Sequence, residues 1–275
     1  MYLETLVIGS NGWIGKYLLQ SFPSFNSANI PSNLSYRDFK EWLSGQNHQC
    51  FINCVGKFSG PTHEMEWANV GVTELILTHA KKIGARVICL GSAAEYGKNG
   101  SSILREDADT KPITEYGEQK LVATNMINDF AQTGTSAISA RLFNVIGPNQ
   151  PYSTAIGQII KKMESLSTKN ELYLNNFDIT RDYITIDFVA RTIKRLIELD
   201  LIGVLNVGSG KPIKLIDFVS RIGKLKNVYI KQGSLSEDRI LCSVADTSKL
   251  ESLNIDDCNV GLDALSKLCL QKSDY

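Results

Sequence analysis

The sequence predicts an α/β fold: a doubly wound parallel sheet followed by a smaller C-terminal domain. Two observations lead to this class. Short β-rich runs alternate with longer segments of helical periodicity through the first half of the chain, which is the order of βαβ units. Runs such as VICLG at 87–91 are continuously apolar, as expected for strands of a sheet that is buried on both faces.

The elements of the first half follow one another in a regular order. Between the first helix and residue 50 the pattern is weaker, with one short strand near 28–30 and one helix near 36–44. The second strand of the sheet is therefore expected to be abbreviated. We expect the other strands at TLVIG (5–9), CFINCV (50–55), RVICLGS (86–92) and SAISARLFNVIG (136–147), with helices over 13–22, 66–84 and 116–134.

The pattern changes after Gly147 and Pro148. We expect one helix over 151–170, a strand over 171–176, a strand that leads into an amphipathic helix over 181–203, and a strand, glycine-rich turn and helix over 204–225. The first domain is predicted to span 1–145, with 180–204 returning to it. The second domain is predicted to lie mainly within 146–275.

Composition excludes several classes of protein. The chain of 275 residues is 43% hydrophobic and 21% charged, which is the range of a globular protein. Lys plus Arg and Asp plus Glu both number 29, so no general electrostatic footprint for nucleic acid is present. No run approaches the ~18 apolar residues of a membrane span, and the N-terminal apolar run lacks the basic segment of a secretory signal. We expect a cytoplasmic protein without nucleic-acid or membrane partners.

The cysteines show no pattern typical of a metal site. They include no C-x-x-C pair, and several lie inside apolar runs. We predict that no metal is bound and that the thiols are free and buried. The six are Cys50, Cys54, Cys89, Cys242, Cys258 and Cys269.

The turn after the first strand is a candidate phosphate site. Gly9, Gly12 and Gly15 are spaced G-x-x-G-x-x-G, which differs from the G-x-G-x-x-G of the dinucleotide fingerprint. A strand that ends at Gly9 and a helix that begins near Trp13 place backbone N–H groups and a positive helix end where a pyrophosphate binds. The alternative is a tight βα turn that holds no ligand.

Three side chains further along the chain suggest chemistry. Tyr116 and Lys120 are four residues apart on a predicted helix, so they project on one face. A neighbouring ammonium favours the phenolate, so we expect Lys120 to lower the pKa of Tyr116 toward the working range. Ser92 follows a strand at the edge where ligands bind in a parallel sheet, and its hydroxyl suits a carbonyl oxygen; the alternative for Ser92 is a turn or helix cap.

Taken together, these features resemble the extended short-chain dehydrogenase/reductase family, in its branch that acts on nucleotide sugars. G-x-x-G-x-x-G is the usual loop of that family. The resemblance covers nearly the whole chain. Its further segments are NCVG at 53–56, NVGVTELI from Asn69, ARLFNVIGPNQ at 140–150, RDYITIDFVA at 181–190, LNVGSGKPIKLIDF at 205–218 and DRILCSVADTSKL at 238–250.

The resemblance implies a Rossmann-type domain that binds NAD or NADP and a C-terminal domain that binds a nucleotide sugar. It implies three catalytic residues, namely Ser92, Tyr116 and Lys120. The implied cofactor-binding residues are Gly9, Asn11, Gly12, Trp13, Ile14, Gly15, Asn53, Val55, Gly56, Asn69, Tyr116 and Lys120. The implied substrate-binding residues are Ser92, Asn144, Arg181 and Arg239, with the two arginines as candidates for the diphosphate.

Departures from the family pattern narrow the reaction. Dehydratases of the family carry an Asp-Glu pair after the catalytic hydroxyl, where this chain has Ala93 and Ala94, and Glu95 is displaced by one residue. The Cys and His of its epimerase/reductases are missing from the corresponding segments, and His63 reads as a surface loop residue. We therefore expect NAD(P)H-dependent reduction of the C4 ketone of a nucleotide-linked 4-keto-6-deoxysugar. The alternatives are an NAD-dependent 4-epimerase and, from another class, a non-catalytic sensor or scaffold.

Cofactor choice and assembly depend on weaker features. No acidic residue occurs over 28–33, where NAD selectivity normally arises, and Arg37 is a candidate for a 2′-phosphate. We prefer NADP slightly over NAD. The helices over 69–82 and 115–131 correspond to those that form the dimer interface in the family, so the resemblance implies a homodimer.

Overall fold

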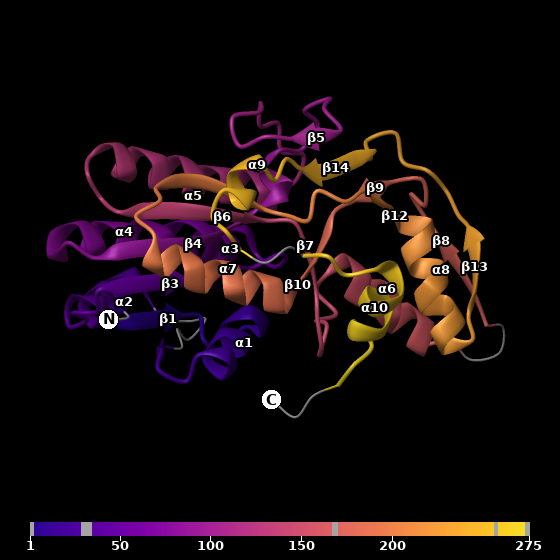
Figure 1. The fold of residues 1–275 in the computed structure, drawn as a ribbon, viewed down its shortest axis with the longest axis horizontal. Coiled ribbons are helices and arrows are strands. Elements are labelled where there is room, and N and C mark those ends of the chain that lie inside the picture. The colour runs from indigo at the N-terminus through magenta and orange to yellow at the C-terminus, as the bar shows by residue number, and fades with distance from the viewer. Residues whose placement is uncertain (1–2, 29–34, 167–169, 256–257, 273–275) are drawn as a thin grey trace.

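The computed structural model describes residues 3–28, 35–166, 170–255 and 258–272. Its largest feature is a six-stranded sheet with the order β11-β6-β4-β3-β1-β2 (Figure 1). Every neighbouring pair is parallel, which confirms the predicted α/β class. The strands are β1 (Thr5–Ile8), β2 (Asn26–Ala28), β3 (Cys50–Asn53), β4 (Arg86–Ser92), β6 (Ala137–Leu142) and β11 (Gly203–Val207).

Helices cover both faces of this sheet. In β1, Val7 packs into the core beneath one layer, whereas Leu6 and Ile8 pack into the core beneath the other. Both faces of the strand are therefore apolar, which explains its uninterrupted hydrophobic run. One layer contains α1 (Trp13–Ser21) and α7 (Ile186–Glu198); the other contains α2 (Tyr36–Ser44), α4 (Val72–Ile83) and α5 (Glu115–Gln132).

The region between α1 and β3 agrees with its weak pattern. Strand β2 has three residues, and α2 occupies the predicted 36–44. Two predictions fall partly outside the described residues. These are positions 29 and 30 of the predicted strand, and positions 29–33 of the segment in which no acidic residue occurs. Upstream of α4, the helical path begins with α3 (Thr62–Glu66) and passes through a π-helical turn η1 (Trp67–Gly71).

A second group of elements lies at the other end of the molecule (Figure 1). Its core gathers Ile156, Leu172, Phe218 and Leu265. The helices are α6 (Ala155–Glu164), α8 (Leu215–Lys226) and α10 (Leu262–Leu268). Strand β8 (Glu171–Leu174) pairs in parallel with β13 (Tyr229–Gln232) in this group. A further parallel pair, β7 (Asn144–Ile146) with β10 (Tyr183–Thr185), lies between this group and the large sheet (Figure 1).

The single helix predicted over 151–170 is too long. Thr154 caps α6 by accepting the backbone N–H of Gly157, and the helix ends at Glu164. Residues 167–169 lie outside the described part of the chain. The next predicted strand is also shorter than expected, because β8 ends at Leu174 and Asn176 has a left-handed φ of 49°.

A small four-stranded sheet of order β12-β9-β14-β5 brings together segments that are distant in sequence. Strand β5 belongs to the loop that leaves η2, the short helix Ala93–Glu95, whereas its partner β14 comes from the last part of the chain. The members are β12 (Ile213–Lys214), β9 (Thr180–Arg181), β14 (Cys242–Ala245), which leads into α9 (Ser248–Glu251), and β5 (Ile103–Leu104). None of the described helices is both long and apolar enough to cross a membrane.

Candidate active site

The glycine turn has the shape of a phosphate cradle. Gly9 has a φ of +85°, and an added Cβ at Gly15 would lie 2.4 Å from the Gly9 carbonyl oxygen. Side chains are thus excluded where the backbone of the turn folds against the start of α1. Gly12 is the N-cap residue, and no side chain caps this end of the helix. The backbone N–H groups of the first turn of α1 and its positive end fit a dinucleotide pyrophosphate.

Ser92, Tyr116 and Lys120 converge on one cavity. Ser92 ends β4, and the other two lie on the first turns of α5, so the predicted helical spacing places them together. Both Ser92 and Tyr116 line the cavity, and Ser92 acts on the Tyr116 phenol by lowering its pKa. The Lys120 ammonium is buried and donates to the Leu90 carbonyl oxygen over 2.9 Å.

The pKa of Tyr116 is raised, whereas the sequence led us to expect a lowered pKa. Burial raises the pKa of its phenol; Ser92 opposes that rise and the nearby Glu95 carboxylate adds to it. The predicted lowering by Lys120 is therefore wrong. The amine is itself desolvated, which lowers its own pKa. The phenol consequently stays protonated at neutral pH, as a proton donor must be.

The cavity that these groups share measures about 700 Å³ and joins the carboxyl edge of the large sheet to the second group of elements. Three cationic side chains, Lys57, Lys120 and Arg181, line it, and no Asp or Glu occurs among its described lining residues. Lys57 pairs with Glu64 beside the cavity, so Lys120 and Arg181 are the cations without a carboxylate partner among the described residues. Seven of the predicted cofactor residues line it as well: Gly12, Trp13, Ile14, Val55, Gly56, Tyr116 and Lys120. A cavity with this lining suits a large anionic ligand.

The remaining predicted cofactor residues lie behind or beside the cavity. Asn53 accepts the Val55 N–H and donates to Thr73. Fully buried Asn69 accepts the N–H of Lys57 and donates to its carbonyl oxygen, both over 2.9 Å. These two amides therefore shape the loop that follows β3. Gly9 and Gly15 shape the turn, and Asn11 is exposed on it.

The substrate side of the cavity is formed by Asn144 and Arg181. The Asn144 amide donates to the Asp182 carbonyl oxygen over 2.8 Å. Arg181 donates to the carbonyl oxygens of Thr180 and Ile240, and no carboxylate among the described residues pairs with it. Burial lowers the pKa of its guanidinium. Arg181 thus offers a desolvated positive charge to the cavity.

Arg239 is placed differently from the expectation. Its guanidinium binds Asp178 through Nε and Nη2, over 3.0 and 2.8 Å, and it is not among the lining residues. The neighbouring Ile240 lines the cavity instead. An arginine that already pairs with a carboxylate is less available to a diphosphate.

The segment after Ser92 agrees with the reasoning from the sequence. Ala93 and Ala94 line the cavity, whereas Glu95 is fully buried and pairs with Arg141. The displacement by one residue therefore turns the carboxylate away from the cavity. Ser92 also caps η2 by accepting the Ala94 N–H. The helix cap that was the alternative to a chemical role for Ser92 is therefore present, and the hydroxyl still lines the cavity. His63 is exposed on α3 and does not line the cavity.

Sequence reasoning missed three residues of the site. Phe58 lines the cavity, and its ring contacts that of Tyr116 in a tilted arrangement. Gln150 is buried, and its amide accepts the Gly147 N–H and donates to Thr154. Asp182 is fully buried and accepts the backbone N–H groups of Ser209, Gly210 and Ala245. Asp182 and Gln150 lie in the segments 181–190 and 140–150, but only contacts across the fold reveal which groups they bind.

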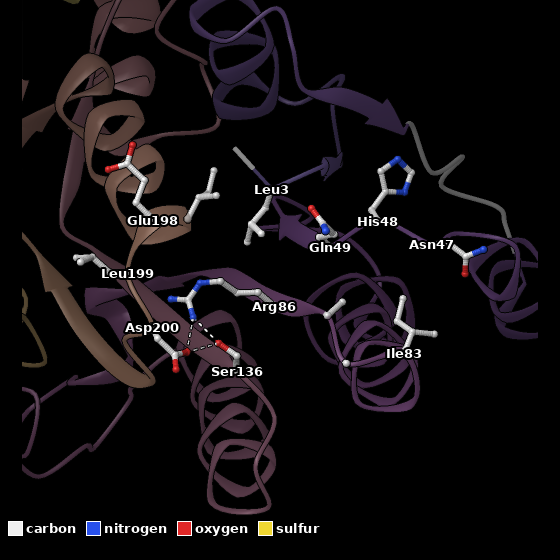
Figure 2. A pocket seen from close by; sticks show the side chains of 13 residues that line it. Leu3, Asn47, His48, Gln49, Ile83, Arg86, Ser136, Glu198, Leu199 and Asp200 are labelled. Atoms are coloured by element: carbon white, nitrogen blue, oxygen red, sulfur yellow. Dashed lines mark hydrogen bonds and ion pairs between the residues drawn. The ribbon is translucent and has the colours of Figure 1, made fainter. Parts of the chain in front are cut away.

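A second cavity lies at the opposite edge of the sheet, at the amino ends of its strands (Figure 2). Arg86 is its central cation. Its guanidinium donates to the carbonyl oxygens of Leu196 and Leu201 over 2.9 and 2.8 Å and also pairs with Asp200. These contacts join β4 to the end of α7, so the charge of Arg86 is engaged in holding the fold.

The thiols agree largely with the prediction. All six cysteines are free, and Cys50, Cys89, Cys258 and Cys269 are buried, whereas Cys54 and Cys242 are partly exposed. Within the described residues, no group of three or more His, Cys, Asp or Glu side chains is arranged to hold a metal ion.

This combination of a parallel doubly wound sheet, a glycine turn and a Ser, Tyr and Lys site is that of the extended short-chain dehydrogenase/reductases, and the chain falls within that class. More narrowly, it belongs to the NAD-dependent epimerase/dehydratase family, whose model matches residues 36–208.

Individual relatives are distant. The chain is 29% identical over 168 residues to dTDP-6-deoxy-L-talose 4-dehydrogenase (NAD(P)(+)) of Kitasatospora kifunensis, in a match that covers 58% of this chain and 53% of that protein. The match therefore spans about half the length of this curated relative.

Two solved structures share the fold over nearly their whole length. RMD from Pseudomonas aeruginosa, complexed with NADPH, has a TM-score of 0.79 at 21% identity and covers 97% of both chains. UDP-N-acetylglucosamine 4-epimerase from Methanobrevibacter ruminantium M1, in complex with UDP-N-acetylmuramic acid, has a TM-score of 0.80 at 20% identity and covers 97% of this chain and 98% of that one. At these identities the likeness shows the fold.

Proposed function

We propose that this protein reduces the C4 ketone of a nucleotide-linked 4-keto-6-deoxysugar with NADH or NADPH. The observation that carries the proposal is the convergence of Ser92, Tyr116 and Lys120 on one cavity. The described residues that line this cavity include cationic side chains and no Asp or Glu. The phosphates of a nucleotide sugar supply the matching negative charge. The 4-dehydrogenase relative acts, by its name, on a dTDP-linked 6-deoxysugar.

The glycine turn and the groups at the end of β3 would hold the nicotinamide dinucleotide. Gly12, Trp13 and Ile14 form the part of the turn that lines the cavity, and Val55 and Gly56 flank it on the β3 loop. When bound, the reduced nicotinamide supplies the hydride for C4. NADP is slightly preferred to NAD, because no acidic residue occurs over 28–33.

The side chains of this chain divide the remaining work. Tyr116 donates its phenol proton to the oxygen of the ketone as that oxygen becomes an alkoxide. Ser92, which lines the cavity beside Tyr116, donates a hydrogen bond from its hydroxyl to the same oxygen and holds it in place. Lys120, which lines the same cavity, would bind the ribose of the nicotinamide, as the family resemblance implies. Asn144 and Arg181 bind the diphosphate at the far side of the cavity.

The main alternative is a 4-epimerase, which uses the same three side chains. A 4-epimerase is among the solved structures with a similar fold, and this fold is compatible with either reaction. An epimerase would turn over its sugar without added NAD(P)H, whereas a reductase consumes the reduced cofactor stoichiometrically. Purification of the protein with tightly held NAD would favour the epimerase.

The proposal is tested with a panel of nucleotide-linked 4-keto-6-deoxysugars, each offered with NADH and with NADPH. We expect loss of reduced-nicotinamide absorbance with a restricted set of sugars. Tyr116→Phe should lower kcat by about 10²–10⁴-fold while the affinity for the cofactor is kept. Tyr229→Phe is the matched control, because Tyr229 is 68% exposed on β13, away from the cavity. Full activity of Tyr116→Phe would show that Tyr116 is not the acid, and binding without turnover of any sugar would favour a non-catalytic sensor or scaffold.

Assembly and location complete the proposal. We infer a homodimer formed through α4 and α5, as the family resemblance implies, and a cytoplasmic location. The oligomeric state is tested by light scattering of the purified protein, in which the mass of a single chain would contradict the dimer.

A further inference from the structure

A buried ion pair lies directly behind Ser92. Glu95 ends η2 and is fully buried. One of its carboxylate oxygens accepts the Ser92 backbone N–H over 2.7 Å. The other accepts Nε and Nη2 of Arg141 over 2.9 and 2.8 Å. Both oxygens are therefore engaged, and the carboxylate cannot rotate without breaking one of these contacts.

The surrounding residues fix the pair in place. An added Cβ at Gly91 would lie 2.9 Å from a Glu95 oxygen, so the carboxylate packs directly on the backbone of β4. The Arg141 guanidinium lies 4.3 Å from the centre of the Tyr96 ring. The Tyr96 hydroxyl in turn donates to Asn206 over 2.7 Å. This chain of contacts anchors Glu95 to β6 and β11, which are rigid strands of the large sheet.

The position of Ser92 depends on this anchor. Ser92 has extended backbone angles, with φ −147° and ψ 140°, at the point where β4 ends and η2 begins. Here the strand leaves the sheet, and the bond to Glu95 fixes the peptide plane of Ser92. The hydroxyl of Ser92 lies on that same residue and lines the cavity together with Tyr116, whose pKa it lowers. A small rotation of the peptide would move the hydroxyl away from the ketone oxygen.

We propose that Glu95, held by Arg141, is a positioning residue that sets the Ser92 hydroxyl against Tyr116 for the reaction. This inference rests on the proposed function, since the reaction is the one proposed above. It assigns Glu95 a role other than that of the acids in dehydratases, because its carboxylate faces the core and touches no ligand space. The role is exerted through Ser92, and Glu95 itself does not take part in proton transfer.

The test compares Glu95→Gln with Glu106→Gln. Glu106 accepts the Asn206 N–H over 2.9 Å at the far end of the same network and makes no contact with Ser92, so it is the matched control. For Glu95→Gln we expect kcat to fall by about 10–100-fold, while KM and the affinity for the cofactor stay within about twofold. The Ser92 amide should also exchange its hydrogen faster, and its proton resonance should shift. Glu106→Gln should leave these quantities unchanged.

Removing one charge leaves the other buried and unpaired, so Glu95→Gln can fail to fold. The double variant Glu95→Gln with Arg141→Met removes both charges and keeps the experiment decisive. We expect it to be folded with a low kcat. A folded variant with normal kcat and a normal Ser92 amide would overturn the proposal and leave Glu95 a purely structural role.

The proposed reaction can be wrong while the positioning role of Glu95 is right, and the experiment distinguishes the two outcomes. If the wild-type protein reduces none of the ketosugars, the reaction is wrong, and the Ser92 amide and the Tyr116 ring resonances then decide the inference without substrate. Because the Glu95 charge also acts on Tyr116 directly, the comparison uses the double variant, which has lost both charges. Faster hydrogen exchange of the Ser92 amide together with a shift of the Tyr116 ring resonances in that variant would support positioning of Ser92 against Tyr116. Unchanged signals would overturn it.

Discussion

The ring of Phe58 lies 4.7 Å from the ring of Tyr116, measured between centroids, at an interplanar angle of 44°. Phe58 is 52% exposed, so much of the ring faces the cavity and solvent instead of a core. Its backbone is held through Lys57, whose N–H and carbonyl oxygen both bond to Asn69. A preorganised aromatic surface therefore lies beside the phenol that is proposed to donate the proton.

Phe58→Ala tests this surface. We expect KM for the nucleotide sugar to rise by about 3–10-fold, because an apolar contact with the sugar is lost. Cofactor affinity should be unchanged. Tyr173→Ala removes an aromatic ring that is 66% exposed on β8 and serves as the control in steady-state kinetics. An unaltered KM for Phe58→Ala would mean that the ring does not contact the sugar.

Gly15→Ala tests the glycine turn. The new Cβ would lie 2.4 Å from the Gly9 carbonyl oxygen and 3.0 Å from the Ser10 Cα, so the turn must open. We expect cofactor affinity to fall by about 10-fold or more, as measured by fluorescence titration with NADPH and NADH. Gly45→Ala is the control, because its Cβ would meet nothing closer than 3.6 Å. Equal affinities of the two variants would contradict the proposed pyrophosphate site.

Arg181→Gln and Arg239→Gln separate the two arginines that the sequence suggested for the diphosphate. Arg181 lines the cavity without an acidic partner among the described residues, whereas Arg239 is bound by Asp178. We expect Arg181→Gln to raise KM for the nucleotide sugar by about 10–100-fold, since a hydrogen bond to a charged group is lost. Arg239→Gln should have the smaller effect. The reverse order in the same assay would restore Arg239 as the main diphosphate ligand.

The desolvated thiols are predicted to react slowly with thiol-labelling reagents at pH 8. Burial raises the pKa of Cys50, Cys54 and Cys89 from 9.0 to about 12. At pH 8 their thiolate fraction is then about 1000-fold lower than that of an ordinary thiol, so labelling of the native protein should be slow. We expect a rapid phase only from partly exposed Cys242, and Cys242→Ser should remove it. Rapid labelling of Cys50 or Cys89 in the native protein would contradict their burial.

The same thiols affect stability. Below pH 9 they are protonated in both the folded and the unfolded chain. Between about 9 and about 12 only the unfolded chain ionises, which favours unfolding. The free energy of unfolding, measured in urea, should therefore fall from pH 8 to pH 10. A rise over this interval would show that the thiols are not desolvated in the folded protein.

Much of the site was predictable because short-range rules fix it. The four-residue spacing of Tyr116 and Lys120 needs only a helix to place them on one face, and α5 supplies it. Ser92 needed only a strand end. The glycine spacing needed only a βα turn. By contrast, the helix expected over 151–170 was too long, because periodicity does not reveal where Thr154 caps α6.

The sequence by itself determined the alternation of apolar strands and helices, and with it the parallel sheet and the edge at which the reactive groups meet. Only the tertiary structure decided what surrounds each group. Burial raises the pKa of Tyr116 although Lys120 lies nearby, Asp178 occupies Arg239, and Arg141 turns Glu95 into the core. The reason is that local periodicity specifies the direction of a side chain, whereas its charge state and partners depend on desolvation and on residues that are distant in sequence.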